Sequence, residues 1–144
     1  MLYMKNHWQF LVVFLVVLVL TGCGNQAPAP AADVALSDAL SLPVDLDVAT
    51  VEQVRNRDDV VLIDVREDSE YAEGHIPGAV LIPLGQIPDR LDEIPQDKTV
   101  IAVCRSGNRS GQATNFLQQQ GFTNVHNMQG GMNAWSQAGY EIEK

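Results

Sequence analysis

The chain has 144 residues, with 18 acidic and nine basic side chains and a formal net charge of −9. This length allows one domain of ordinary size, whose core needs no disulfide. The charge argues against nucleic acid or an anionic membrane surface as the main partner, because neither attracts an acidic face. The chain's two cysteines are too few for a disulfide scaffold or a cysteine-rich structural zinc site.

A short apolar segment precedes the first cysteine. The run from Phe10 to Leu20 is unbroken, and Lys5 is the basic residue before it. As a helix this run reaches about 16 Å, roughly half the thickness of a bilayer core. The segment is therefore typical of a secretory signal peptide and too short for a spanning helix.

The residues Leu20-Thr21-Gly22-Cys23 resemble the lipobox of bacterial lipoproteins. This resemblance implies a signal peptide over residues 1–22, cleavage before Cys23, and lipid attachment at Cys23. The exported chain would be anchored to the cell envelope through its lipid alone, and losing Lys5 would change its charge from −9 to −10. Gly24 in place of Asp favours the outer membrane, facing the periplasm, in a diderm bacterium. The outer face of the cell membrane is expected otherwise.

An Ala- and Pro-rich tether is expected over residues 23–42, and a globular domain over residues 43–144. Within the domain, strand patterns alternate with helical ones. The expected strands are 44–48, 60–63, 79–82, 99–103 and 124–127. Five helices are expected. The first begins at a capping box formed by Thr50–Gln53, and another carries an apolar stripe at positions 87, 91 and 94. The other three cover residues 68–73, 110–120 and 132–138. The alternation predicts an α/β fold, with a mostly parallel sheet of about five strands and helices on both faces.

The second cysteine follows the buried strand 99–103 directly. Sites in open α/β sheets form beyond the carboxyl ends of strands, and a helix N-terminus lowers the pKa of a nearby thiol. Gly107 allows backbone amides to turn inward as an anion-binding nest, and Arg105 and Arg109 add two cations. These features predict that Cys104 is a nucleophile acting on an anionic substrate.

The loop Cys104-Arg105-Ser106-Gly107-Asn108-Arg109-Ser110 resembles the active-site loop of single-domain rhodaneses, the thiosulfate sulfurtransferase family. Segments in the same order extend the resemblance over roughly residues 57–141: Leu62–Arg66, Glu70-Tyr71, Gly74–Ala79 and Gly130–Trp135. The resemblance implies the rhodanese-like three-layer fold and sulfur transfer from thiosulfate to a thiol or cyanide through a Cys104 persulfide. Arg105, Ser106, Gly107, Asn108 and Arg109 would bind the anionic donor. No metal or organic cofactor is implied.

Other residues are expected to support this site. Asp64, Arg66 and Ser110 would fix the loops at the strand ends, with substrate contact by Arg66 as the alternative. His75 is expected to be a hydrogen-bonded turn residue, whereas His126 and Trp135 are expected to be structural.

Three other functions are alternatives to sulfur transfer from thiosulfate. Cys-based phosphatases use Cys-x5-Arg, whereas here four residues separate Cys104 from Arg109. The shorter loop suits a sulfur atom better than a tetrahedral phosphate, which disfavours phosphatase or arsenate reductase activity. A non-catalytic binding module and a protein-to-protein persulfide relay at the envelope remain the alternatives. The acceptor would accordingly be a small-molecule or protein thiol.

Overall fold

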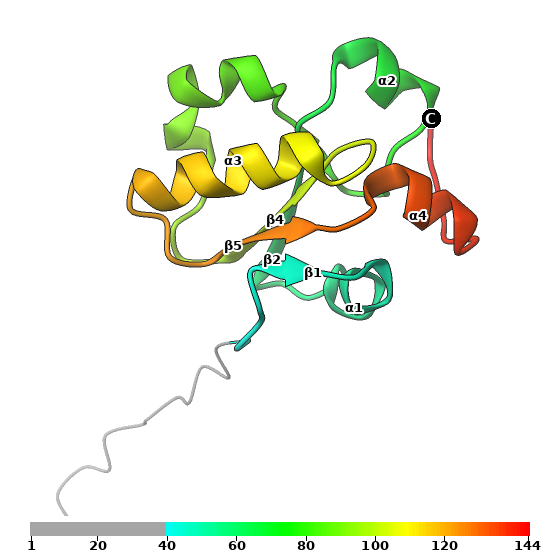
Figure 1. The fold of residues 1–144 in the computed structure, drawn as a ribbon, viewed down its shortest axis with the longest axis horizontal. Coiled ribbons are helices and arrows are strands. Elements are labelled where there is room, and N and C mark those ends of the chain that lie inside the picture. The colour runs from blue at the N-terminus through cyan, green and yellow to red at the C-terminus, as the bar shows by residue number, and fades with distance from the viewer. Residues whose placement is uncertain (1–39) are drawn as a thin grey trace, which may run out of the picture. The chain divides into compact units, whose positions relative to one another are not determined.

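A five-stranded parallel sheet forms the centre of the computed structural model, which describes residues 40–144 (Figure 1). The strands in chain order are β1 (Asp45–Leu46), β2 (Val60–Asp64), β3 (Val80–Leu81), β4 (Thr99–Val103) and β5 (Val125–Met128). Their spatial order is β1-β5-β4-β2-β3, which the sequence pattern did not predict. The predicted α/β fold class is confirmed. The order places β4 at the centre of the sheet, so that the residue after it is flanked by the ends of β2 and β5.

Helical segments cover both faces of this sheet. The α-helices are α1 (Val48–Val54), α2 (Asp68–Glu73), α3 (Asn108–Gln119) and α4 (Gly131–Gln137), and two 3₁₀ segments are η1 (Leu84–Asp89) and η2 (Leu91–Glu93). Figure 1 shows α3 and α1 on opposite sides of the strands. Among the described residues, no helix is both long and apolar enough to cross a membrane.

The central strand β4 supplies side chains to both apolar cores. Val100 and Ala102 pack with residues of α3 and η1, whereas Ile101 and Val103 pack with residues of α1 and α4. Every residue of β4 is buried. Burial on both faces explains why this strand is a continuous apolar run in place of an alternating one.

The predicted start of the first helix was wrong. The capping box at Thr50 and Gln53 implied a start near Thr50, but α1 begins at Val48 and Asp47 is its N-cap. The Asp47 carboxylate accepts a hydrogen bond from the Thr50 backbone N–H at 2.7 Å. Asp47 therefore satisfies a free N–H group of the first turn, and Thr50 lies within the helix.

The apolar stripe at positions 87, 91 and 94 does not lie on an α-helix. Ile87 and Ile94 are buried as expected. However, Ile87 lies in the 3₁₀ segment η1, and Ile94 follows the 3₁₀ segment η2 directly. Pro88 lies inside η1, and proline has no N–H for an α-helical hydrogen bond. Apolar spacing alone could not distinguish the two kinds of helix.

Several predictions concern residues outside the described part of the chain. The signal peptide over residues 1–22, the lipid attachment at Cys23 and most of the tether over residues 23–42 all fall before residue 40. They stay predictions.

Candidate active site

Cys104 lies at the carboxyl edge of the sheet, directly after β4. The loop after it is shorter than predicted, because α3 begins at Asn108 and not at Ser110. Gly107 is the N-cap residue, with φ of 93°, a left-handed conformation that glycine adopts readily. Arg109 and Ser110 therefore both lie in the first turn of α3. The free N–H groups of that turn are brought close to the cysteine.

Hydrogen-bond donors surround the Cys104 sulfur, which is buried. The Gly107 backbone N–H donates to Sγ at 3.1 Å, and the Ser110 hydroxyl oxygen lies 3.2 Å from Sγ. Burial is the strongest single influence and raises the pKa of the Cys104 thiol. The Ser110 hydroxyl and the backbone N–H groups of Ser110, Ser106 and Gly107 together outweigh burial and lower this pKa below its usual value. The site thus favours the nucleophilic thiolate.

The amino end of α4 holds the loop in this shape. The Met132 N–H donates to the Cys104 carbonyl at 2.8 Å, and the Asn133 N–H donates to the Arg105 carbonyl at 3.0 Å. A Cβ atom on Gly131 would overlap the Cys104 carbonyl oxygen. The close approach therefore requires glycine. Sequence reasoning did not assign Gly131 to the site, although the Gly130-Gly131 pair before a helix was a usable signal.

One carboxylate joins the two arginines of the loop. Glu70 of α2 accepts hydrogen bonds from Nη1 and Nη2 of Arg109 at 2.7 and 2.8 Å. Its Oε1 lies 3.2 Å from Nε of Arg105. Hydrogen bonding to Arg109 is the main cause that lowers the pKa of Glu70 to about 2. Glu70 was noted only as part of the resemblance, so its contact with both arginines was missed.

The same family appears when the chain is compared with known proteins. The sequence matches the Rhodanese-like domain over residues 47–138, which is more than half of the chain. The chain belongs to this family. A sulfurtransferase of Allochromatium vinosum is 44% identical over 91 residues, which cover 63% of this chain and 85% of that protein. The thiosulfate sulfurtransferase GlpE of Pseudoalteromonas translucida is 34% identical over 93 residues, covering 65% and 89%.

Solved rhodanese-like structures share the fold. A rhodanese-related protein of Thermoplasma volcanium superimposes with a TM-score of 0.64 at 29% identity, covering 70% of this chain and 98% of that one. A rhodanese-like domain protein of Staphylococcus aureus gives 0.63 at 33% identity, covering 71% and 100%. Family membership and the names of the relatives support a sulfurtransferase-type enzyme.

In this rhodanese-like domain, Arg66 is buried, and protein groups accept most of its hydrogen bonds. Its guanidinium donates to the Asp64 carboxylate, with a shortest distance of 2.6 Å, and to the carbonyls of Glu70 and Gly74 at 3.1 and 2.9 Å. Asp64 has no exposed surface. These bonds join the end of β2 to α2, the helix that carries Glu70. Arg66 also borders the cavity beside the loop, although the bonds to protein groups use most of its donors.

The remaining loop side chains are more exposed than the cysteine. Arg105 is 62% exposed. The Ser106 side chain is exposed too, although its backbone N–H contributes to the sulfur's surroundings. Asn108 accepts a hydrogen bond from Gln112 at 2.7 Å on the surface of α3. Around the sulfur, the structure thus brings together backbone N–H groups and Ser110.

A cavity of about 460 Å³ opens beside the loop, between α2 and α4. Glu70, Arg105 and Asn133 are among its lining residues, and polar surface predominates. Ile142 of the C-terminal segment contributes an apolar part of the wall. A small anionic or polar molecule that enters this cavity meets Arg105 next to the cysteine loop.

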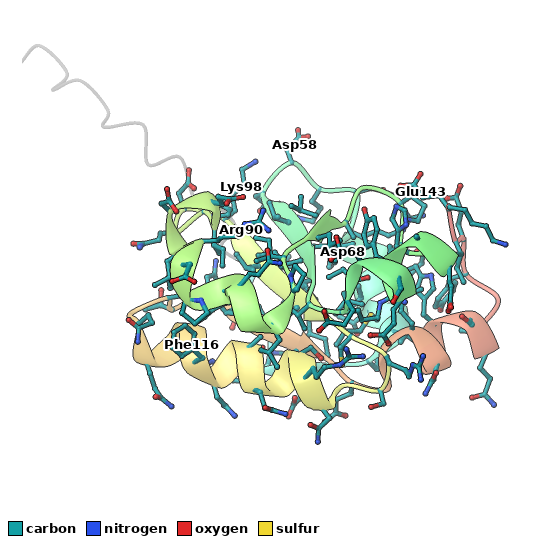
Figure 2. All side chains as sticks on the ribbon, turned by 90° about the horizontal axis from the view of Figure 1, so that it is seen from above. Asp58, Asp68, Arg90, Lys98, Phe116 and Glu143 are labelled. Atoms are coloured by element: carbon teal, nitrogen blue, oxygen red, sulfur yellow. The ribbon has the colours of Figure 1, made fainter. Side chains whose placement is uncertain are left out.

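In the described part of the chain, His75 and His126 make structural contacts, and neither is among the hydrogen-bond partners of the sulfur. His75 stacks on Tyr71 with ring centroids 3.6 Å apart, and its Nε2 lies 3.1 Å from Oε1 of Glu143. Figure 2 shows Glu143 on the C-terminal segment beside α2. His126 Nδ1 lies 2.7 Å from the Pro43 carbonyl oxygen. Within residues 40–144, no group of three or more metal-ligating side chains is positioned to hold an ion.

Proposed function

We propose that the chain is a sulfurtransferase, which moves sulfane sulfur from thiosulfate or another persulfide donor to a thiol or cyanide. The observation that carries the proposal is the position of the Cys104 sulfur. It lies within a ring of hydrogen-bond donors at the N-terminus of α3, where a negative charge on sulfur is stabilised. The family membership and the sulfurtransferases among the relatives support the same activity.

Two displacements complete a turnover in this proposal. The Cys104 thiolate attacks the outer sulfur of thiosulfate, whose sulfur–sulfur bond breaks as sulfite leaves with the bonding electron pair. The loop N–H groups stabilise the resulting persulfide anion. An acceptor thiolate or cyanide then attacks the outer sulfur, and Cys104 leaves as the thiolate. No net oxidation or reduction of the enzyme occurs over the cycle.

The arginines are proposed to have unequal roles in binding the donor. Arg105 is 62% exposed and has one contact with Glu70 through Nε. Both Nη atoms of Arg109 are bonded to Glu70. We therefore assign capture of the oxyanion end of the donor mainly to Arg105. The engagement of Arg109 also argues against a phosphatase, which needs its loop arginine to bind phosphate.

We further propose that the exported protein is anchored to the cell envelope by lipid on Cys23. The support is the sequence alone: an apolar run, Leu20-Thr21-Gly22-Cys23, and the Ala- and Pro-rich segment that follows. Several acyl chains make a stable anchor, because each buried methylene contributes about 0.8 kcal/mol. The full-length protein should incorporate labelled palmitate in bacterial cells. Continued labelling of Cys23→Ala would overturn this assignment.

The activity is tested with protein lacking residues 1–23. Wild-type protein should form thiocyanate from thiosulfate and cyanide, and Cys104→Ser should lose this turnover while keeping the circular dichroism spectrum of the folded domain. A wild-type domain that is folded but inactive with thiosulfate, and accepts no sulfur from a persulfidated protein either, overturns the proposal. Activity only with the persulfidated protein identifies the relay.

A further inference from the structure

A row of hydrogen bonds connects the Cys104 sulfur, at the end of the central strand, to the edge strand β1. The Ser110 hydroxyl oxygen lies 3.2 Å from Cys104 Sγ and 2.6 Å from Asn127 Oδ1. The side-chain amide of Asn127 donates through Nδ2 to Asp45 Oδ1 at 2.8 Å. Ser110 and Asn127 are buried, and Asp45 is exposed on β1. The row thus extends from solvent through β5 and α3 to the nucleophile.

The surface carboxylate determines how the row is oriented. An ionised carboxylate only accepts hydrogen bonds, so the NH₂ group of Asn127 must face Asp45. The carbonyl oxygen of Asn127 then faces Ser110. Two oxygens 2.6 Å apart require a hydrogen between them, and the hydroxyl of Ser110 is the one group that can supply it. The orientation follows from donor and acceptor chemistry.

The hydroxyl of Ser110 carries a single hydrogen, for which Asn127 and the sulfur compete. When that hydrogen is directed to Asn127, a lone pair of Ser110 faces Sγ. A lone pair suits a thiol, whose S–H can donate to it. It is also compatible with the inner sulfur of a persulfide, because the negative charge then resides on the outer sulfur. It is unfavourable for a thiolate, which needs donors.

We propose that Asn127, oriented by Asp45, is a positioning residue that competes with the Cys104 sulfur for the hydrogen of Ser110 and so weakens the hydrogen bond from Ser110 to the sulfur. The unloaded thiolate then receives a weaker hydrogen bond from Ser110 and stays more nucleophilic, because nucleophilicity falls as a thiolate is stabilised. In the loaded enzyme the negative charge is on the outer sulfur, so a weaker hydrogen bond from Ser110 does not destabilise the inner sulfur. The consequence for turnover rests on the proposed sulfurtransferase function, whereas the effect on the thiol does not.

Other charged or titratable groups also lie on the elements packed around this end of the sheet. Their effect on the pKa of Cys104 should be the same in all the variants that test this proposal. α4 carries none. The remaining packed elements and the loop contribute Asp64, Arg66, Glu70, Arg105, Arg109 and His126. A test of Asn127 must therefore separate its action through Ser110 from a general change in this electrostatic field.

The test compares Asn127→Ala, Ser110→Ala and the double variant, without any sulfur donor. The rate of Cys104 alkylation by iodoacetamide, followed against pH, reports the ionisation of the thiol. Asn127→Ala should lower the pKa of Cys104 by about one unit, the scale of one hydrogen bond to a charged group. The same substitution in the Ser110→Ala background should leave that pKa unchanged, because the hydroxyl is absent.

Asp45→Ala provides a second variant, because Asp45 is exposed and its removal leaves the core intact. It should shift the pKa in the same direction by a smaller amount, and again only when Ser110 is present. An equal shift in the Ser110→Ala background means a through-space charge effect and overturns the proposal. So does an unchanged or raised pKa in both Asn127→Ala and Asp45→Ala. If the protein forms no thiocyanate, the proposed function fails, but the measured pKa of Cys104 still tests the role of Asn127.

Discussion

Two groups of arginines and carboxylates lie at the same edge of the sheet and differ in burial. The inner pair consists of Arg66 and Asp64, with side chains 6% and 0% exposed. The outer cluster consists of Arg105, Arg109 and Glu70, with side chains 62%, 28% and 16% exposed. In the inner pair the guanidinium also donates to two backbone carbonyls. In the outer cluster two cations share one carboxylate.

The difference shows that an arginine paired with a carboxylate can have a structural or a binding role, depending on how deeply the pair is buried. A buried ion pair persists only where further hydrogen bonds offset the loss of water, and those bonds occupy most of the donors that a ligand could use. A partly exposed cluster with more cations than anions keeps an arginine able to bind an anion. The inner pair therefore belongs to the framework, and the outer cluster is the part of the site that we propose binds the donor.

The largest expected effect comes from breaking the inner pair. Arg66→Ala leaves Asp64 buried without its cation, which should cost about 3–5 kcal/mol in the free energy of unfolding. Urea unfolding measures this change. Arg90→Ala is the matched control, because the Arg90–Glu93 pair lies at the surface and water screens it, so its loss should change the free energy of unfolding far less. Equal losses of unfolding free energy in Arg66→Ala and Arg90→Ala would show that the buried pair is no more important for stability than the surface pair.

Removing the exposed arginine of the outer cluster should affect binding more than stability. Arg105→Ala should raise KM for thiosulfate about tenfold, the scale of a hydrogen bond to a charged group. The free energy of unfolding should change by about 0.5 kcal/mol or less, as is usual for surface substitutions. Steady-state kinetics and urea unfolding of the same preparation check both values. A large loss of stability with unchanged KM would make Arg105 a framework residue.

Neutralising the shared carboxylate should have the opposite effect on binding. Glu70→Gln removes the charge that offsets Arg105 and Arg109, so KM for thiosulfate should fall about two- to fivefold. The gain should shrink as ionic strength rises, because these charges are partly exposed. A higher KM at every salt concentration would show that Glu70 holds the arginines in their binding positions.

The outer cluster should also give stability a modest dependence on acid. The pKa of Glu70 is lowered to about 2 from 4.5, mainly by Arg109. A carboxyl with a lowered pKa stabilises the fold above its unfolded-state pKa, and this contribution is lost as pH falls from about 4.5 towards 2. Urea midpoints across that range should decline less steeply in Glu70→Gln than in wild type. Parallel declines would contradict the assigned ionisation.

Local patterns predicted the framework better than the contacts of the site. The apolar run of β4 and the cysteine after it were readable from neighbouring residues. The contact between Glu70 and Arg109 joins positions 39 apart in sequence, and it depends on how α2 packs beside the loop. The approach of Asn127 to Ser110 depends on β5 lying next to β4. Strand order was not readable from the sequence pattern, so neither contact was predicted.

In the proposed function Cys104 carries sulfur as a persulfide, which intact mass spectrometry can detect after brief thiosulfate treatment. Wild-type protein lacking residues 1–23 should gain the mass of one sulfur atom, which cyanide should then remove. Cys104→Ser should gain nothing under the same conditions. An unmodified wild-type protein, or a sulfur added equally to the Cys104→Ser variant, would contradict the account.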